Sequence, residues 1–165
     1  MSNERAEILL RLAAEAGITI TTAESCTGGM VAAAITDIPG SSAIFERGFV
    51  TYSNEAKTDM LGVVPKLIAA HGAVSEPVAK AMAEGALAKS LAQLSIAITG
   101  IAGPGGTANK PEGRVCFGLA REQRDTSIST IDFGALGRTT VRERARDHAL
   151  DLLIEACRAQ ETGAP

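Results

Sequence analysis

The sequence predicts an α/β fold, in the form of a layered α/β/α sandwich with a mixed, mostly parallel sheet and a C-terminal hairpin. Two short runs of apolar and β-branched residues, 18–22 and 94–99, have the composition of buried strands. Segments with apolar residues at helical spacing precede and follow these runs. This alternation of strands and helices indicates a sheet with helices on both faces.

The predicted helices combine helical spacing of apolar residues with a start or stop residue. Gly17 ends the first helix, and Pro77 suits the first turn of the fifth. Asn54 is predicted as the N-cap of the third helix, and Thr139 or Thr140 as the cap of the last. The helices span 4–16, 30–37, 55–61, 65–70, 76–90 and, for the last, from this cap to 159.

Five strands are predicted from β-branched and aromatic residues between turn signals. The last two, on either side of the polar turn 121–125, are expected to pair antiparallel. The other three lead into polar turns near Ser25, Tyr52 and Gly100. Because carboxyl ends of strands gather at one edge of such folds, we expect these turns to share a pocket. The strands span 18–22, 43–52, 94–99, 114–120 and 128–133.

The composition is that of a globular protein with a hydrophobic core. The 165 residues are 45% hydrophobic and 21% charged, so disorder is not expected and we predict one domain over 1–165. The net charge is −3 and no polybasic run is present, which predicts no nucleic-acid partner and no membrane partner. The charged N-terminus does not resemble a signal peptide, and no apolar run is long enough to span a bilayer.

The three cysteines are Cys26, Cys116 and Cys157, which lie far apart and form no CxxC pair. This spacing indicates neither a zinc site nor a disulfide framework. A reducing compartment suits such a chain, so we expect a cytoplasmic location and no metal ion.

The turn 22–29 is the strongest candidate for chemistry, because it joins a predicted strand to a predicted helix. It holds two adjacent nucleophiles, Ser25 and Cys26, near a helix N-terminus that favours anions. Gly28 and its neighbour Gly29 leave room for a ligand to approach the backbone. The alternative is an ordinary N-cap formed by Ser25 or Thr27.

Ser25 needs a base, and Lys57 is the best placed, since it follows another of the three turns. Burial lowers the pKa of a lysine, and Tyr52 is a further proton-relay candidate. The alternative is a solvated lysine beside a half-buried tyrosine. His71 and His148 are interpreted as structural, although a serine–histidine–aspartate triad is not excluded. Cys26 is a rival nucleophile, or a small buried apolar residue.

The glycine-rich loop 99–106 and Arg138 are candidates for anion binding. Loops of this kind cradle phosphates with their backbone N–H groups, although a plain flexible connection fits the composition equally well. Arg138 precedes a predicted helix N-terminus, where a cation is disfavoured unless an anion binds there. An exposed arginine without a ligand is the alternative.

Four stretches, in the same order, resemble the CinA C-terminal domain family, whose members include stand-alone nicotinamide-nucleotide amidohydrolases. They are 22–29 (TAESCTGG), 48–57 (GFVTYSNEAK), 72–75 (GAVS) and 99–106 (TGIAGPGG). The resemblance implies hydrolysis of the carboxamide of nicotinamide mononucleotide to nicotinic acid mononucleotide and ammonia. It implies a small-molecule substrate, no metal or organic cofactor, and a homo-oligomer, with a dimer favoured.

Carried over to this chain, the resemblance makes Ser25 the nucleophile and Lys57 with Tyr52 the base system. It matches Thr99 to the family's loop threonine and Arg138 to its arginine near the start of the last helix. With these two we predict as substrate-binding residues Thr27, Gly28, Gly100, Gly103 and Gly105. The chain departs from the family at 136–138, where Leu-Gly-Arg stands for Gly-Asp-Arg, and at 111–114, where Pro-Glu-Gly-Arg stands for Pro-Val-Gly-Thr.

Two other functions remain open. One is a non-catalytic nucleotide-binding or interaction module of the competence- and damage-inducible type. Such a module has no need for a serine, a tyrosine and a lysine together, and this chain keeps Ser25, Tyr52 and Lys57. The other is a general esterase that uses Ser25 and needs no phosphate on its substrate.

Overall fold

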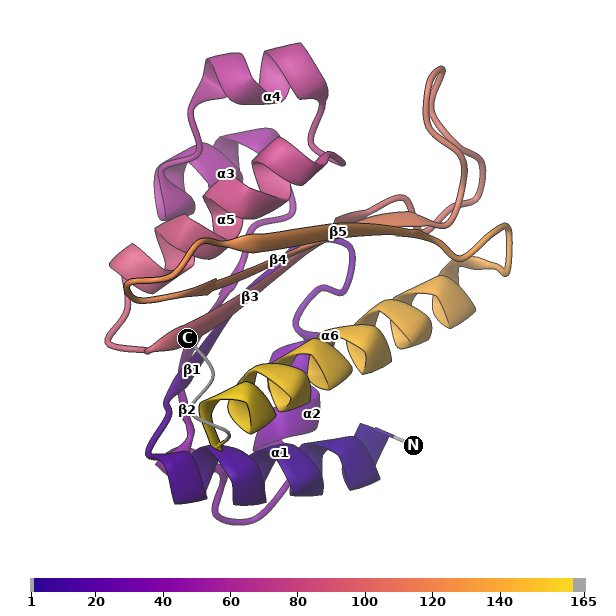
Figure 1. Ribbon diagram of the computed structural model, residues 1–165. Coiled ribbons are helices and arrows are strands. Elements are labelled where there is room, and N and C mark those ends of the chain that lie inside the picture. Colours follow the sequence, from indigo (N-terminus) through magenta and orange to yellow (C-terminus); the bar gives the residue numbers. More distant parts are fainter. Residues whose placement is uncertain (1, 162–165) are drawn as a thin grey trace.

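The computed structural model describes residues 2–161 and contains a five-stranded sheet flanked by helices (Figure 1). The strand order is β2-β1-β3-β4-β5. The elements are α1 (Ser2–Ala16), β1 (Ile20–Glu24), α2 (Met30–Thr36), a 3₁₀ turn (Ser41–Ala43), β2 (Phe45–Val50), α3 (Asn54–Leu61), α4 (Pro65–His71), α5 (Glu76–Ala88), β3 (Leu94–Gly100), β4 (Arg114–Arg121), β5 (Ser127–Asp132) and α6 (Arg138–Glu161).

The sheet is mixed. Strand β1 pairs in parallel with both β2 and β3, whereas β4 pairs antiparallel with β3 and with β5. Four strands therefore run in one direction, and β4 alone is reversed. The predicted fold class, including the hairpin formed by β4 and β5, is confirmed.

Helices cover both faces of the sheet. Figure 1 shows α1, α2 and α6 on one face and α3, α4 and α5 on the other. Successive side chains of β3 point to opposite faces of the sheet. Ile96 and Ile98 join the core under α6, whereas Ala97 joins the core under α5. Small residues let α5 lie close to the sheet, since a Cβ on Gly118 would overlap the carbonyl oxygen of Ala79.

Several predicted boundaries were wrong by one or two residues. Strand β1 begins at Ile20 instead of 18, because the Ile18 N–H still bonds to the carbonyl of Ala13 at the end of α1, at 2.9 Å. Strand β2 covers only Phe45–Val50 of the predicted 43–52. Ser53 caps α3 instead of Asn54, since its side chain accepts the Ala56 N–H.

The last helix also begins earlier than predicted. Arg138 is its first residue, so Thr139 and Thr140 lie inside α6 and cap nothing. Gly137 precedes the helix, and its carbonyl accepts the Val141 N–H at 3.0 Å. The apolar face predicted for this helix packs on the sheet as expected, with Val141 and Leu153 fully buried. No helix within residues 2–161 combines the length and apolar character of a membrane span.

Candidate active site

A cavity of about 180 Å³ lies at the carboxyl ends of the three parallel strands β1, β2 and β3. The turns that follow these strands all contribute to it, as the topology requires. Its lining residues are Ser25, Cys26, Tyr52, Lys57, Ala73, Val74, Thr99, Gly100, Ala102 and Arg138. The structure thus brings together seven residues singled out in the sequence: Ser25, Cys26, Tyr52, Lys57, Thr99, Gly100 and Arg138.

Ser25 and Lys57 form the centre of this cavity. Lys57 is only 1% exposed, and its Nζ donates to Ser25 Oγ at 3.0 Å and to the carbonyl of Thr51 at 2.7 Å. The position of Lys57 follows from α3, whose N-cap is Ser53 and whose buried face carries this lysine. No ion pair reaches Lys57 from any residue in 2–161, and burial lowers the pKa of its ammonium group. The lysine is therefore suited to act as a neutral amine beside a serine hydroxyl.

The turn that carries Ser25 is tight. The Gly28 N–H donates to the Ser25 carbonyl at 3.0 Å, and Gly28 and Gly29 have φ angles of 58° and 106°. These left-handed conformations favour glycine. Neither Ser25 nor Thr27 caps α2. The N-cap residue is Gly29, which has no side chain to accept an N–H of the helix. The N-cap alternative for these two residues is therefore wrong.

Glu24 does the capping that was expected of the turn. Its side chain is fully buried, and its two carboxylate oxygens accept the Val31 and Ala32 N–H groups at 2.9 and 3.0 Å. A carboxylate at this place satisfies two free helix donors and the positive end of the helix dipole. The N–H groups of Val31 and Ala32 are therefore taken from within the protein and are not free for a ligand.

Cys26 does not compete with Ser25 as a nucleophile. Its side chain is 5% exposed, and burial raises the pKa of its thiol to about 12. A thiol with such a pKa holds almost no thiolate at neutral pH. Of its two interpretations, the small buried apolar residue is the one the structure supports.

Tyr52 and Arg138 form the open side of the cavity. Arg138 Nη2 donates to the Tyr52 hydroxyl at 2.6 Å, and Nη1 donates to the carbonyl of Gly103 at 2.8 Å. Tyr52 is 62% exposed, and within residues 2–161 no hydrogen bond joins its hydroxyl to Ser25 or Lys57. Arg138 stands on the first turn of α6, where a cation is disfavoured unless an anion joins it.

Thr99 and the glycine-rich loop contribute unequally. Thr99 Oγ1 donates to the carbonyl of Ala73 at 2.9 Å, which ties β3 to the segment before α5. A side chain at Gly100 would collide with its surroundings, since a Cβ there would lie 2.7 Å from Val115 Cγ2. Gly103 and Gly105 do not line the cavity, and the Gly105 N–H is taken by the carboxylate of Glu112.

Thr27 and Gly28, the other two predicted substrate-binding residues, also lie outside the cavity lining. Thr27 is fully buried and its hydroxyl has no partner within residues 2–161. A Cβ on Gly28 would lie 3.2 Å from Arg142 Nη2. The missing side chain at Gly28 therefore makes room for Arg142.

The two departures from the family pattern at 111–114 have partners in the structure. Glu112 accepts the Gly105 N–H at 3.0 Å. Arg114 forms a two-pronged pair with Asp132, at 2.8 and 3.1 Å, directly across the ladder between β4 and β5. Glu112 therefore contacts the glycine-rich loop 99–106 directly, and Arg114 links the two strands that follow this loop.

Neither histidine lines the cavity. The ring of His148 packs edge-on against Phe117 with ring centroids 4.7 Å apart, and His71 ends α4. A serine–histidine–aspartate triad is therefore excluded at Ser25. Within residues 2–161 no group of three or more histidines, cysteines or carboxylates is arranged to hold a metal ion.

Sequence reasoning missed three residues that shape the site: Glu24, Arg142 and Lys110. Arg142 Nε donates to the carbonyl of Cys26 at 2.9 Å, and Lys110 Nζ donates to the carbonyls of His71 and Val74. One signal was present for Arg142, which lies one helical turn after Arg138 and so on the same face. Nothing in the sequence marked the other two.

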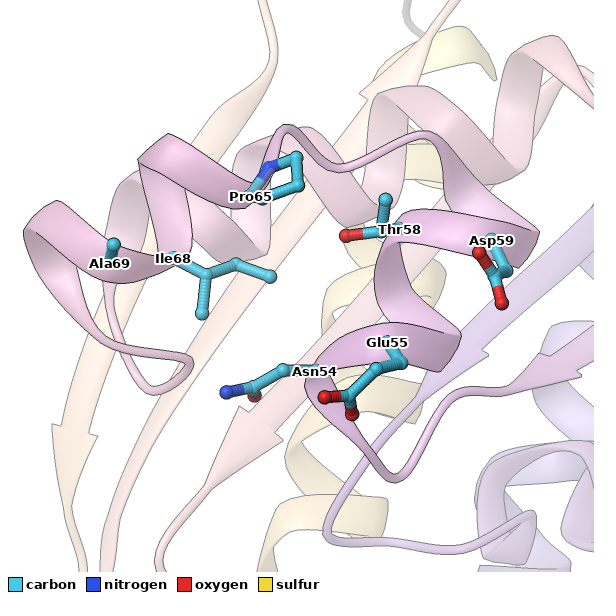
Figure 2. A pocket seen from close by; sticks show the side chains of 7 residues that line it. All are labelled: Asn54, Glu55, Thr58, Asp59, Pro65, Ile68 and Ala69. Carbon is cyan, nitrogen blue, oxygen red and sulfur yellow. The ribbon is translucent and has the colours of Figure 1, made fainter.

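A second hollow, of about 420 Å³, lies between α3 and α4 (Figure 2). Figure 2 shows side chains of both helices around it, including the carboxylates of Glu55 and Asp59. None of its residues was a predicted site residue, and it lies against a different face of α3 from the one that carries Lys57. The lining residues are Asn54, Glu55, Thr58, Asp59, Pro65, Ile68 and Ala69.

Solved structures confirm the fold. The competence/damage inducible protein of Agrobacterium tumefaciens is 44% identical, has a TM-score of 0.91, and is matched over 93% of this chain and 94% of that chain. A CinA superfamily protein of Escherichia coli is 33% identical with a TM-score of 0.91, over 94% of this chain and 90% of that one.

Sequence relatives are of two lengths. Nicotinamide-nucleotide amidohydrolase PncC of Escherichia coli K12 is 54% identical over 138 residues, 83% of each chain. The putative competence-damage inducible protein of Symbiobacterium thermophilum is 55% identical over 152 residues, 87% of this chain and 35% of that protein. The chain thus spans about a third of this relative and of two CinA-like proteins. The model of the CinA C-terminal domain matches residues 2–157, and the chain belongs to this family.

Proposed function

We propose that this protein is an amidohydrolase that converts nicotinamide mononucleotide to nicotinic acid mononucleotide and ammonia. The observation that carries the proposal is the buried Lys57 amine, 3.0 Å from Ser25 Oγ and without a carboxylate partner in the described chain. A relative of similar length, 54% identical, bears the name nicotinamide-nucleotide amidohydrolase. The resemblance noted in the sequence points to the same reaction.

The first step is proton transfer from Ser25 to Lys57. A neutral amine keeps two N–H groups and one lone pair. When the amine is neutral, its bond to the Thr51 carbonyl uses one N–H group, and its lone pair can accept the Ser25 hydroxyl proton across the 3.0 Å between Nζ and Oγ. The Ser25 hydroxyl gives its proton to Nζ while its oxygen attacks the carboxamide carbon. Burial lowers the pKa of Lys57, which favours the neutral amine that accepts this proton.

Backbone N–H groups then stabilise the oxyanion. Those of Cys26 and Thr27 directly follow the nucleophile and have no backbone acceptor within residues 2–161. The Gly28 N–H, in contrast, is taken by the Ser25 carbonyl. Fixed donors aimed at a developing negative charge lower the barrier of acyl transfer.

The tetrahedral intermediate collapses when the Lys57 ammonium returns its proton to the leaving nitrogen. Ammonia departs and an ester between Ser25 and the nicotinoyl group remains. A water molecule then gives a proton to Lys57 and attacks this ester. Its collapse restores the serine hydroxyl and releases the carboxylate of nicotinic acid mononucleotide.

Recognition of the nucleotide falls to the open side of the cavity. The guanidinium of Arg138 donates hydrogen bonds to the exposed Tyr52 hydroxyl and to the Gly103 carbonyl. It has no carboxylate partner in the described chain. A phosphate group can replace these neutral partners and form charge-assisted bonds. Thr99 and Gly100, which line the same cavity, are placed to contact the rest of the nucleotide.

The test is ammonia release from nicotinamide mononucleotide, nicotinamide riboside and nicotinamide, by the wild type and by Ser25→Ala. We expect release from the mononucleotide alone, reduced about 10⁴-fold or more in Ser25→Ala. The melting temperature of the variant serves as the folding control. Normal release by Ser25→Ala would contradict the assignment of the nucleophile. Equal hydrolysis of small esters without a phosphate would favour the general esterase.

The second candidate is a nucleotide-binding or interaction module. It is favoured by the match to relatives about three times as long, in which this region is one part. In that case no compound releases ammonia, while nicotinamide mononucleotide still raises the melting temperature. A dimer and a cytoplasmic location remain parts of the proposal, and light scattering with cell fractionation tests them.

A further inference from the structure

Arg142 lies outside the cavity and donates hydrogen bonds to the turn that carries Ser25. Its Nε donates to the carbonyl of Cys26 at 2.9 Å, and its Nη2 donates to the carbonyl of Thr27 at 3.4 Å. Arg142 stands on α6, 116 residues further along the chain from Cys26. It does not line the cavity, and no ion pair joins it to a carboxylate within residues 2–161. Its guanidinium is therefore directed at the backbone of the turn.

The bond to the Cys26 carbonyl sets the direction of one peptide plane. The Cys26–Thr27 peptide bond is trans, so its carbonyl and its N–H point in opposite directions. Because Arg142 holds the Cys26 carbonyl, the Thr27 N–H is turned away from α6. On the preceding peptide, the Ser25 carbonyl accepts the Gly28 N–H, which fixes the direction of the Cys26 N–H in the same way.

Arg142 comes close to the backbone of the turn at Gly28, a residue that the sequence analysis singled out. Gly28 has a φ of 58°, and a Cβ on it would stand 3.2 Å from Arg142 Nη2. On the other side of the turn, the carboxylate of Glu24 holds the start of α2. The turn is thus held at both ends by charged side chains that do not line the cavity.

We propose that Arg142 is a positioning residue, which holds the carbonyl of Cys26 so that the N–H group of Thr27 faces the oxyanion formed at Ser25. The inference rests on the proposed function for its reaction, but not for its geometry. Loss of Arg142 lets this peptide plane rotate, which lowers the rate of the chemical step and leaves binding of the nucleotide unchanged.

The test compares Arg142→Met, which keeps the length of the side chain and removes its donors, with Arg142→Lys, which keeps one donor group. Arg144→Met is the matched control, because Arg144 is an exposed arginine on the same helix. For Arg142→Met we expect kcat for ammonia release to fall about 10- to 100-fold with KM within about twofold, as for small misplacements of catalytic groups. Arg142→Lys recovers part of the loss, and Arg144→Met matches the wild type.

A second readout does not depend on the natural substrate. A fluorophosphonate reacts with an activated serine by forming an O–P bond as fluoride leaves, and its rate reports the same oxyanion donors. We expect labelling of Ser25 to slow in Arg142→Met and to be unchanged in Arg144→Met. If the wild type labels but releases no ammonia from nicotinamide mononucleotide, the proposed function fails while the inference on Arg142 is still tested.

Three outcomes overturn the inference. One is a kcat and a labelling rate in Arg142→Met equal to those of the wild type. Another is a rise in KM at constant kcat, which would make Arg142 a substrate-binding residue. The third is a wild-type Ser25 that does not react with the reagent at all. Should Arg142→Met fail to fold, as judged by its melting curve, Arg142→Lys decides, and wild-type rates in that variant count against the inference.

Discussion

The two sides of the cavity differ in how firmly the protein holds their side chains. On the inner side, Ser25 and Lys57 are 8% and 1% exposed, and Lys57 makes two hydrogen bonds inside the protein. On the outer side, Tyr52 is 62% exposed, and Arg138 bonds to a hydroxyl and a carbonyl at the surface. The inner groups are fixed before a substrate arrives, whereas the outer groups are able to exchange their partners.

This difference has a chemical reason. A lysine serves as a base only when its ammonium form is disfavoured, and burial is what disfavours it. An arginine that binds a phosphate must instead stay charged and reach a ligand that enters from water. We therefore expect substitutions on the inner side to change kcat, and substitutions on the outer side to change KM.

The largest effect is expected for Lys57→Met, which removes the base and keeps the volume of the side chain. Since general base catalysis contributes roughly 10²- to 10⁴-fold, kcat for ammonia release should fall by at least that factor. Lys66→Met, an exposed lysine on α4, is the matched control. A normal kcat in Lys57→Met would contradict the expectation that substitutions on the inner side of the cavity lower kcat.

A smaller effect is expected for Arg138→Met on the outer side. A hydrogen bond to a charged group is worth about 1.5–3 kcal/mol, so KM for nicotinamide mononucleotide should rise about 10- to 100-fold. The inhibition constant of nicotinamide riboside, a competitor which lacks the phosphate, should not change. Initial rates with the mononucleotide, with and without the riboside, measure this, and Arg144→Met controls for the lost charge. A fall in kcat at constant KM would place Arg138 on the inner side.

Tyr52→Phe sharpens the comparison, because the two roles of Tyr52 predict different sizes of effect. If the hydroxyl only orients Arg138, its loss costs one exposed hydrogen bond and raises KM about 2- to 10-fold. If Tyr52 accepts the serine proton, kcat falls about 10²-fold or more. Because Tyr52 is exposed and its hydroxyl accepts a hydrogen bond from Arg138, we expect the first result. Steady-state kinetics of the folded variant separate the two.

The smallest effect concerns stability and pH. Burial lowers the pKa of Lys57 in the folded protein below its ordinary value of 10.5. Between the two values the unfolded chain binds a proton that the folded protein does not bind, so the contribution of Lys57 to stability rises with pH. Below the folded-state pKa both forms are protonated, and this contribution is constant.

Melting curves of the wild type and of Lys57→Met from pH 7 to pH 10 measure this effect. The melting temperature of the wild type should rise relative to that of the variant across this range. A constant difference between the two proteins would show that the folded protein keeps Lys57 charged up to its ordinary pKa.

The sequence by itself determined most of the framework of this protein. Periodicity, residue composition and turn signals predicted the six α-helices and five strands of the described residues to within a few residues, because these patterns depend on neighbours in the chain. The resemblance and the strand-to-helix turns also led to Ser25 and Lys57. Their predicted meeting at the carboxyl ends of parallel strands follows from a general property of such sheets.

Only the tertiary structure decided which charged groups support the site. Whether Glu24 caps α2, and whether Arg142 reaches the Cys26 carbonyl from α6, depends on how the helices pack on the sheet. Burial of the Cys26 thiol, which raises its pKa to about 12, depends on the same packing. Arg142 and Cys26 lie 116 residues apart, and the Glu24 bonds span only seven and eight residues but need the folded turn. Local sequence pattern therefore carries little information about these interactions.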